Sequence, residues 1–410
     1  MTGKIIRRDF LKKAALTGAS ITLLGRVPAD GATPDQNTFT SKGEHFTLAF
    51  HAKKGLFSIL RNDGSMLLQN GTARFNLGGE TRSLTSPSFK HRIRSSRITD
   101  QFGTGQMVRI MSEDTDRIID TEIQIVLYDH PEVITIQTVL ANLSQHDLML
   151  SGLEPVCVIQ EHGGRLFIPG VTRCITNGAL YYDAGRIHTF GTPFEKAVPY
   201  GETKGGRMKN SRLSETEETV HSWWNAGFFI GYDREGLVLG YVENNRSLGQ
   251  LLITRIQPDQ VLFTAESVYN PGYMLKPGQK IGSDRFAILM DRNPYKALES
   301  YASMAGASGN ARTHSIINGW CNWFYTYEHT SEEEIIRNAE FAAGNLKKYG
   351  LEYIQVDEGY QRWHGDWEGN ERFPHGMKWL ADRIKGYWLK AGIWVAPYVV
   401  SEPTELFQKN

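Results

Sequence analysis

The 410-residue sequence has few cysteines, no excess of charge of either sign and no long apolar run beyond its first thirty residues. Cys157, Cys174 and Cys321 are too few and too widely spaced for a disulfide framework or a metal motif, and we interpret them as small buried hydrophobic residues. The 45 basic residues balance the 45 acidic residues. Because nucleic acid and anionic membrane surfaces attract a basic excess, we expect neither as a partner.

Motifs of several common enzyme classes are also missing. The sequence contains no HExxH, no CxxC pair, no GxSxG and no Walker loop, and its twelve histidines are scattered along the chain. We therefore expect no metal site and no cofactor. Balanced charge is compatible with a neutral ligand such as a sugar.

Residues 1–32 are typical of an export signal. Arg7 and Arg8, followed by Asp9-Phe10-Leu11-Lys12, form a twin-arginine pattern, and a weakly apolar run follows them over residues 14–24. That run is too short to span a bilayer stably. We expect export through the twin-arginine pathway to the periplasm or the cell exterior, with membrane contact only through this signal. The remaining residues are expected to be soluble.

Residues 33–305 show the period of two that β-strands produce. Residues 121–128 alternate in polarity, with Ile123, Ile125 and Leu127 on one face, and similar short strands are expected around residues 134–136, 236–242 and 261–264. Turn residues such as Asn62-Asp63-Gly64 and Asn270-Pro271-Gly272 separate them. We predict an antiparallel domain of two large packed sheets. A helix opening at Asn293-Pro294 closes it.

Residues 306–410 begin with a linker of small residues and then alternate strand and helix. Strands are predicted at residues 315–320, 353–356 and 392–396. The helix over 331–349 begins with a capping box of Ser331 and Glu334 and ends at Gly350. A second helix is predicted over 376–390. Tyr349 and Trp388 are expected on the inward faces of these helices.

A strand period of nearly forty residues with intervening helices is typical of a (β/α)8 barrel or an open α/β sheet. A complete barrel needs roughly 250 residues, whereas residues 315–410 supply three strands and two helices. Three parallel strands cannot close a barrel. We therefore expect a multidomain β plus α/β protein in which the last domain is the incomplete opening of a barrel.

Polar and aromatic residues follow each of the three predicted strands. Trp323 follows the first strand, Asp357 and Glu358 follow the second, and Trp394 lies at the third. Functional groups of parallel α/β barrels gather at these carboxyl ends. Carboxylates accept hydrogen bonds from vicinal sugar hydroxyls, and indole rings pack against the C–H face of a sugar. The pattern predicts a sugar pocket.

These segments resemble the successive barrel motifs of glycoside hydrolase family 36, the melibiases. The segments that carry the resemblance are Gly319-Trp320-Cys321-Asn322-Trp323, residues 356–361, Gly365-Asp366-Trp367, residues 373–378 and residues 391–397. Residues 275–278 and 294–298 resemble the family's lead-in to the barrel, and Ser222-Trp223-Trp224-Asn225 resembles a feature of its β-domain. Members have an N-terminal β-supersandwich, a (β/α)8 barrel and a C-terminal β-domain.

The resemblance implies a retaining enzyme that cleaves terminal α-galactosides. Asp357 and Glu358 would bind the hydroxyls at C4 and C6 of the galactose, and Trp323 and Trp394 would line the same pocket. Asp366 and Trp367 are candidates for its rim. The nucleophilic and acid/base aspartates of the family follow later strands, so both are expected beyond Asn410 and no catalytic residue is assigned within the chain.

One departure from the family pattern concerns substrate choice. The family usually has Asp-Asp-Gly-Trp where this chain has Asp357-Glu358-Gly359-Tyr360, which leaves galactose, N-acetylgalactosamine or another sugar open. Two alternatives to a hydrolase also stay open. One is an α-galactosyl transferase similar to raffinose synthase, and the other is a non-catalytic glycan-binding protein.

Overall fold

The computed structural model describes residues 37–178, 185–192, 216–230, 235–312 and 315–409. The chain divides into two compact units, residues 1–311 and 312–410. The predicted export signal of residues 1–32 lies outside the described residues. Among the helices of the described ranges, none is long and apolar enough to cross a membrane.

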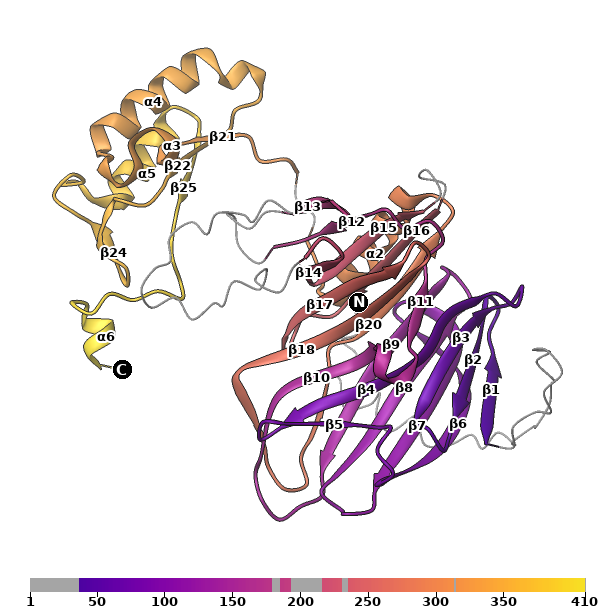
Figure 1. Cartoon of the computed structure of the whole chain (residues 1–410). Helices are drawn as coiled ribbons and strands as arrows, with labels where there is room; N and C mark the ends of the chain where they lie inside the picture. The colour runs from indigo at the N-terminus through magenta and orange to yellow at the C-terminus, as the bar shows by residue number, and fades with distance from the viewer. Residues whose placement is uncertain (1–36, 179–184, 193–215, 231–234, 313–314, 410) are drawn as a thin grey trace, which may run out of the picture. The chain divides into compact units, whose positions relative to one another are not determined.

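The larger unit is built on two antiparallel sheets of ten described strands each (Figure 1). The first sheet has the order β1-β2-β3-β4-β10-β18-β17-β14, with β5 and β11 paired alongside. Its strands are β1 Thr38–Lys42, β2 Phe46–His51, β3 Leu56–Arg61, β4 Met66–Leu77, β5 Glu80–Ser83, β10 Leu148–Val158, β11 Arg165–Phe167, β14 Thr219–Trp223, β17 Leu248–Gln257 and β18 Gln260–Leu275. A short 3-10 helix, Gln160–His162, precedes β11.

The second sheet has the order β13-β12-β15-β16-β20-β9-β8-β7-β6, with β19 paired to β9. Its strands are β6 Phe89–Asp100, β7 Gly103–Asp114, β8 Ile119–Tyr128, β9 Val133–Asn142, β12 Arg173–Thr176, β13 Arg186–Thr189, β15 Asn225–Ile230, β16 Glu235–Tyr241, β19 Lys280–Gly282 and β20 Phe286–Asp291. The prediction of an antiparallel domain with two large sheets is confirmed.

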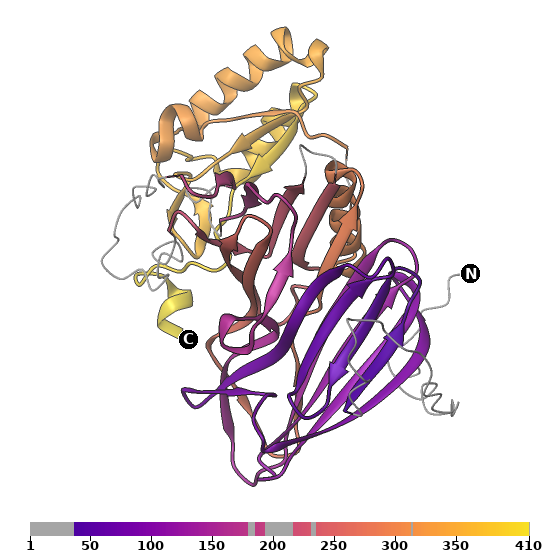
Figure 2. The same ribbon diagram turned by 45° about the vertical axis from the view of Figure 1, so that its right-hand side comes forward.

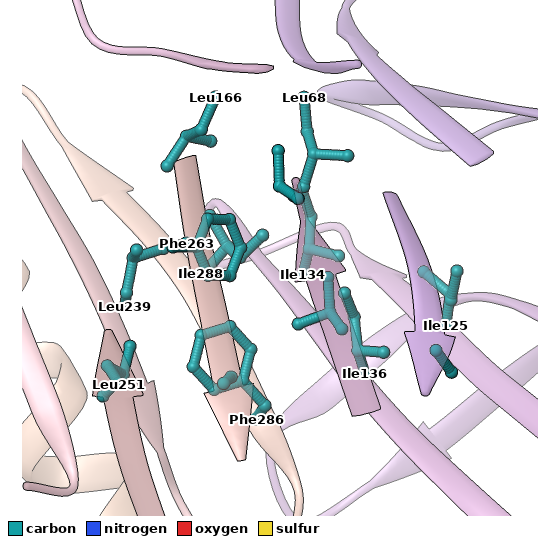
Figure 3. Close-up of a cluster of buried hydrophobic side chains, with 14 of the residues drawn as sticks. Leu68, Ile125, Ile134, Ile136, Leu166, Leu239, Leu251, Phe263, Phe286 and Ile288 are labelled. Atoms are coloured by element: carbon teal, nitrogen blue, oxygen red, sulfur yellow. The ribbon is translucent and has the colours of Figure 1, made fainter. Parts of the chain in front are cut away.

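The main hydrophobic core lies between the two sheets (Figure 3). Phe263 on β18 of the first sheet stacks on Phe286 on β20 of the second, with ring centroids 6.0 Å apart and an interplanar angle of 24°. On β8, Ile123, Ile125 and Leu127 all point into this core and are fully buried, as their alternation predicts. Burial of apolar surface from both sheets therefore holds the sandwich together.

Helix α2 (Pro294–Ser308) covers part of the outer face of the second sheet. Asn293 caps it by accepting hydrogen bonds from the backbone nitrogens of Tyr295 and Lys296, and Pro294 occupies its first turn. Its buried residues Ala297 and Tyr301 share a second hydrophobic cluster with Tyr128 of β8. The helix continues three residues into the predicted linker and ends at Ser308, with Gly309 as its C-cap residue.

The segment Asn270-Pro271-Gly272 lies inside β18, so its interpretation as a turn between strands was wrong. The pairing of β18 with β10 steps from Val268 opposite Gly152 to Tyr273 opposite Leu150. The extra residues form an irregularity in a strand that continues beyond them. Composition alone does not distinguish such a bulge from a chain reversal.

The smaller unit contains a three-stranded parallel sheet in the order β21-β22-β25, of strands Gly319–Cys321, Tyr353–Val356 and Lys390–Ile393. Helices α4 (Glu332–Asn345) and α5 (Gly376–Gly386) belong to the same unit (Figure 2). Their residues Ile335, Ala339, Leu380 and Ile384 form one hydrophobic cluster with Ile354 of β22. The remaining elements are α3 Trp323–Thr326, the 3-10 turns Tyr327–His329 and Lys347–Tyr349, the hairpin of β23 Gln361–Trp363 and β24 Asp366–Gly369, and α6 Glu405–Lys409.

Several predicted boundaries in this unit were wrong. The first strand begins at Gly319, and Ile316 and Ile317 before it are 88% and 65% exposed. Tyr349 is 78% exposed because α4 ends at Asn345 and tightens into a 3-10 turn. Trp388 is 84% exposed because α5 ends at Gly386. After this end, the backbone nitrogens of Tyr387 and Trp388 donate hydrogen bonds to the carbonyls of Ile384 and Lys385.

Candidate functional site

The carboxyl end of β22 places Asp357 on the side of the sheet opposite the helices. Ile354 and Val356 are buried in the cluster beneath α4 and α5. Because side chains alternate along a strand, Gln355 and Asp357 point to the other side. Cys321 of β21 is the register partner of Gln355, so it lies on this same side.

Hydrogen bonds hold the Asp357 carboxylate from several directions. The Gln355 amide donates to its Oδ2 over 2.7 Å, and the Cys321 thiol approaches the same oxygen at 3.2 Å. The Glu358 backbone nitrogen donates to Oδ1 over 2.9 Å, and the Asp357 nitrogen donates to Asn322 Oδ1 over 2.8 Å. Asp357 is only 9% exposed, so these bonds fix a nearly buried carboxylate in one orientation.

Cys321 is coupled chemically to Asp357. Burial, followed by the hydrogen bond and charge of Asp357, raises the pKa of the Cys321 thiol. The thiol therefore stays protonated and serves as a hydrogen-bond donor at neutral pH. Its interpretation as a simple small hydrophobic residue was wrong, although Cys157 and Cys174 are indeed buried.

Glu358 belongs to a neighbouring cluster of rings. Its Oε1 lies 2.8 Å from Nε2 of His364, which sits in the turn between β23 and β24. The His364 ring lies 5.9 Å from Trp394 and 6.5 Å from Trp367, and the two indoles are 6.4 Å apart at 73°. The edge-to-face packing of the two indoles stabilises the arrangement.

Backbone contacts position Trp394 beside β22. Its backbone nitrogen donates to the Val356 carbonyl over 2.8 Å, one residue beyond the end of β25. The buried Tyr360 hydroxyl donates to the Trp394 carbonyl over 3.1 Å. Burial raises the pKa of Tyr360 to about 12, so this hydroxyl remains a donor at physiological pH. The Trp394 backbone is thus held by two hydrogen bonds.

Gly359 shapes the turn that follows the carboxylate pair. Its φ is +107°, and a Cβ atom there would lie 2.4 Å from the carbonyl oxygen of Glu328. Its own carbonyl accepts hydrogen bonds from the side chains of Asn370 and Arg372, each at 2.9 Å. Glycine is required at this position because any side chain would displace backbone.

The structure brings together some of the predicted site residues. Glu358, Trp367 and Trp394 meet around His364, and Asp357 adjoins Glu358 in the chain. Trp323 packs on Tyr327 at 5.3 Å, and its backbone nitrogen lies 3.5 Å from the Cys321 sulfur. The Asp366 carboxylate instead accepts a hydrogen bond from the nearby Glu368 backbone. The binding roles of the six predicted site residues stay predictions.

Cys321, Gln355 and His364 are site residues that the sequence analysis did not assign. Cys321 and Gln355 could have been found from strand alternation, because they share the face of Asp357. His364 lies beside the quoted Gly365-Asp366-Trp367 segment, but the sequence carries no signal that folds its hairpin back onto Glu358.

Two further features lie in the described part of the larger unit. In the larger unit a cavity of about 590 Å³ is lined by Gln137, Arg246, Tyr269, Tyr273 and Lys280 among others, with no carboxylate. Across the described residues, the group suited to hold a metal ion is Glu44, His45 and His130, also in the larger unit. Neither feature includes the strand ends of the smaller unit.

Comparison with known proteins shows similarity to α-galactosidases. No protein-family model matches the chain. The α-galactosidase AgaA of Geobacillus stearothermophilus is 35% identical over 153 residues, which cover 34% of this chain and 20% of that protein. A rice α-galactosidase is 35% identical over 94 residues, covering 21% of this chain and 22% of that protein.

Solved structures show the same fold. The family 36 enzyme AgaA matches with a TM-score of 0.57 at 14% identity, over 91% of this chain and 58% of its own. The Lactobacillus brevis α-galactosidase matches with a TM-score of 0.56 at 14% identity, over 91% and 56%. Variants of AgaA have been solved with raffinose and with stachyose. The chain thus spans less than two thirds of each relative, and its resemblance to glycoside hydrolase family 36 is confirmed.

Proposed function

We propose that the chain forms the N-terminal β-domain and the opening of the catalytic barrel of a retaining α-galactosidase of glycoside hydrolase family 36. The supporting observation is the carboxylate pair at the end of β22 beside the indole at the end of β25. Asp357 and Glu358 supply acceptors for paired hydroxyls, and Trp394 supplies an apolar surface for the sugar ring.

Asp357 is the centre of the proposed recognition. Its carboxylate is held in place by Gln355, Cys321 and the Glu358 backbone before a sugar arrives. A preorganised acceptor loses little entropy when it binds a hydroxyl. A carboxylate also binds hydroxyls more strongly than a neutral acceptor does. We assign Asp357 to substrate binding, with Glu358, Trp323 and Trp394 around it and Asp366 and Trp367 at the rim.

Bond cleavage requires groups other than this pair. Retaining hydrolysis uses two carboxyl groups about 5–5.5 Å apart, one as nucleophile and one as acid and base. Asp357 and Glu358 are adjacent, and both already bind protein donors. We therefore place the nucleophilic and acid/base aspartates on later barrel strands, beyond Asn410. Oligosaccharides with a terminal α-galactose are the proposed substrates.

The open edges of the small sheet support a larger barrel. Among the described residues, β21 and β25 pair only with β22. Ile393 of β25 is half exposed, and Tyr398 shortly after it is 99% exposed. Unpaired edges and exposed apolar side chains are stabilised when further strands and helices cover them.

We propose that the intact enzyme is exported through the twin-arginine signal.

The intact protein, expressed from its full reading frame, should hydrolyse p-nitrophenyl α-galactoside. The variant Asp357→Asn should lower kcat/KM by about 100-fold or more, because two charge-assisted hydrogen bonds are weakened. Asp382→Asn is the matched control, since Asp382 is an exposed carboxylate on α5 that pairs with Lys378. Inactivity of the wild type on every α-galactoside, or equal effects of the two variants, would refute the proposal.

Product analysis distinguishes hydrolysis from transfer. With raffinose alone a hydrolase releases free galactose, whereas a transferase needs an acceptor sugar and forms a longer oligosaccharide. We expect free galactose as the main product. Dominant oligosaccharide products at dilute substrate would instead support the transferase alternative.

A further inference from the structure

We propose that Glu44, His45 and His130 form a zinc-binding site that ties together two turns of the β-sandwich. Glu44 and His45 lie between β1 and β2 of the first sheet, and His130 lies between β8 and β9 of the second. One ligand atom from each residue lies within 4.8 Å of the other two. The site is independent of the proposed glycosidase activity.

The hydrogen bonding of His45 identifies its free nitrogen. Nε2 lies 2.6 Å from the backbone carbonyl oxygen of Asp129. A carbonyl oxygen only accepts hydrogen bonds, so Nε2 must carry the proton. In a neutral imidazole Nδ1 then presents a lone pair. Metal-binding histidines are commonly oriented in this way, with the second ring nitrogen donating to a backbone carbonyl.

That lone pair faces a carboxylate rather than a donor. Nδ1 of His45 lies 3.3 Å from Oε1 of Glu132. For a neutral ring this contact places two acceptors against each other, which a cation between them relieves. The second histidine also lies against a carboxylate, with Nε2 of His130 3.3 Å from Oε1 of Glu44. A proton on each ring is the competing explanation.

The spacing suits a tetrahedral ion. Zinc binds imidazole nitrogen and carboxylate oxygen at about 2.0–2.2 Å, so neighbouring ligand atoms of a tetrahedral site are about 3.3–3.5 Å apart. The contact between His130 and Glu44 has this length, and the ligand atoms of all three residues lie within 4.8 Å of one another. Imidazole with carboxylate is also a donor set that favours zinc over magnesium or calcium. A water molecule would fill the fourth position.

Both turns are held in place without the ion. The Asn62 side chain donates to the Glu44 carbonyl over 2.7 Å, and its backbone nitrogen donates to the His45 carbonyl over 2.9 Å. On the other turn, the Met290 nitrogen donates to the Glu132 carbonyl over 3.1 Å. Arg97 pairs with the Asp129 carboxylate and thereby leaves Glu44 and Glu132 as the negative groups at the site.

The proposal is tested by measuring zinc binding to the whole chain. Any affinity tag is removed first, and EDTA is used to remove bound metal. Titration calorimetry at pH 8 should give one saturable zinc site, and zinc at about 100 times its Kd should raise Tm by about 5 °C, because it binds only the folded state. Magnesium at the same concentration should leave Tm unchanged. The absence of a zinc-induced shift would overturn the proposal.

Variants locate the site. Glu44→Gln and His130→Ala should each weaken zinc binding by at least tenfold, since even outer partners of metal ligands cost that much. His130 is exposed, so its replacement should not unfold the protein. His146→Ala, at an exposed histidine of another turn, should bind zinc as the wild type does. Unchanged zinc affinity in both ligand variants would place the ion elsewhere and refute the assignment.

Discussion

His364 lies 2.8 Å from Oε1 of Glu358, and its ring contacts the indoles of Trp367 and Trp394. One imidazole therefore links the second carboxylate of the pair to the aromatic wall beside it. Glu358 is longer than the aspartate usual in the family by one methylene group, and this carboxylate is the one that His364 binds. Under the proposed function, this pairing makes residue 358 a candidate determinant of sugar preference.

We expect His364→Ala to lower kcat/KM of the intact enzyme for p-nitrophenyl α-galactoside by about tenfold, mainly through KM. The variant releases Glu358 and removes a ring that packs beside both indoles, so binding weakens by about the value of one charged hydrogen bond. Steady-state kinetics measure this change.

His375→Ala is the matched control for that experiment. His375 also pairs with a carboxylate, Glu332, and stacks on an indole, Trp379, but it lies at the start of α5. It should cost similar thermal stability and leave kcat/KM within about twofold of the wild type. Equal kinetic effects of both variants would assign His364 a purely structural role.

The strand-end pattern placed the candidate residues at the carboxyl ends of the strands of the small sheet, and their roles in binding stay predictions. Asp357 directly follows β22, as predicted, and Trp394 lies one residue beyond the end of β25, the next strand of the repeat. The contacts of His364 and Arg372 could not be predicted in this way. They depend on how the chain between β22 and α5 folds back, and tertiary packing rather than local propensity decides that path.

We expect Cys321 to react slowly with iodoacetamide. Burial and the Asp357 carboxylate raise the pKa of its thiol, so at pH 7.5 less thiolate is present than for a free cysteine. Asp357→Asn removes the negative charge and should accelerate alkylation. Mass spectrometry of the alkylated peptide measures the rate at this residue separately from Cys157 and Cys174. Rapid labelling of the wild type, or slower labelling of the variant, would contradict the proposed coupling.

The larger unit was predictable in class but not in topology. Alternation in β8 predicted the core face occupied by Ile123 and Ile125. The strand order was not predictable, since the chain crosses from the first sheet to the second between Trp223 and Asn225. Trp224 makes that corner with a φ of +62°. A positive φ at tryptophan is imposed by the surrounding fold and has no signal in the sequence.

Glu266 predicts a pH-dependent difference in stability. Burial raises its pKa, the charge of Glu154 adds to this effect, and Gln250 and Arg74 oppose it. A raised folded-state pKa means that the stability this carboxyl contributes is present below the ordinary range of glutamate and is lost as pH rises through the raised pKa.

Glu266→Gln should therefore have nearly the wild-type Tm at pH 4 and a higher Tm than the wild type at pH 8. Glutamine keeps an oxygen that accepts the hydrogen bond from the Gln250 amide, which is 2.7 Å away in the wild type. Calorimetry at several pH values measures the difference, and Glu80→Gln on an exposed strand serves as the control. A Tm difference that falls with rising pH would show that the charged form is the stabilised one.

Gly359 and Gly344 form a matched pair of glycines in the smaller unit. At Gly359 a Cβ atom would meet the Glu328 backbone at 2.4 Å with φ at +107°, whereas at Gly344 within α4 a Cβ atom would meet no atom within 4 Å. Gly359→Ala should lower the free energy of unfolding by about 2–4 kcal/mol, because it combines backbone strain with a clash. Gly344→Ala should raise it by about 0.5–1 kcal/mol, because alanine favours the helix.

Urea titration followed by tryptophan fluorescence resolves these two effects. All nine tryptophans except Trp223 and Trp224 lie in residues 312–410, so the signal reports mainly on the smaller unit. Gly359→Ala should also weaken the hold of Asn370 and Arg372 on the turn, since both donate to the Gly359 carbonyl. If Gly359→Ala were as stable as the wild type, the turn after the carboxylates would have to adopt another path, and the position of Glu358 beside His364 would no longer follow from it.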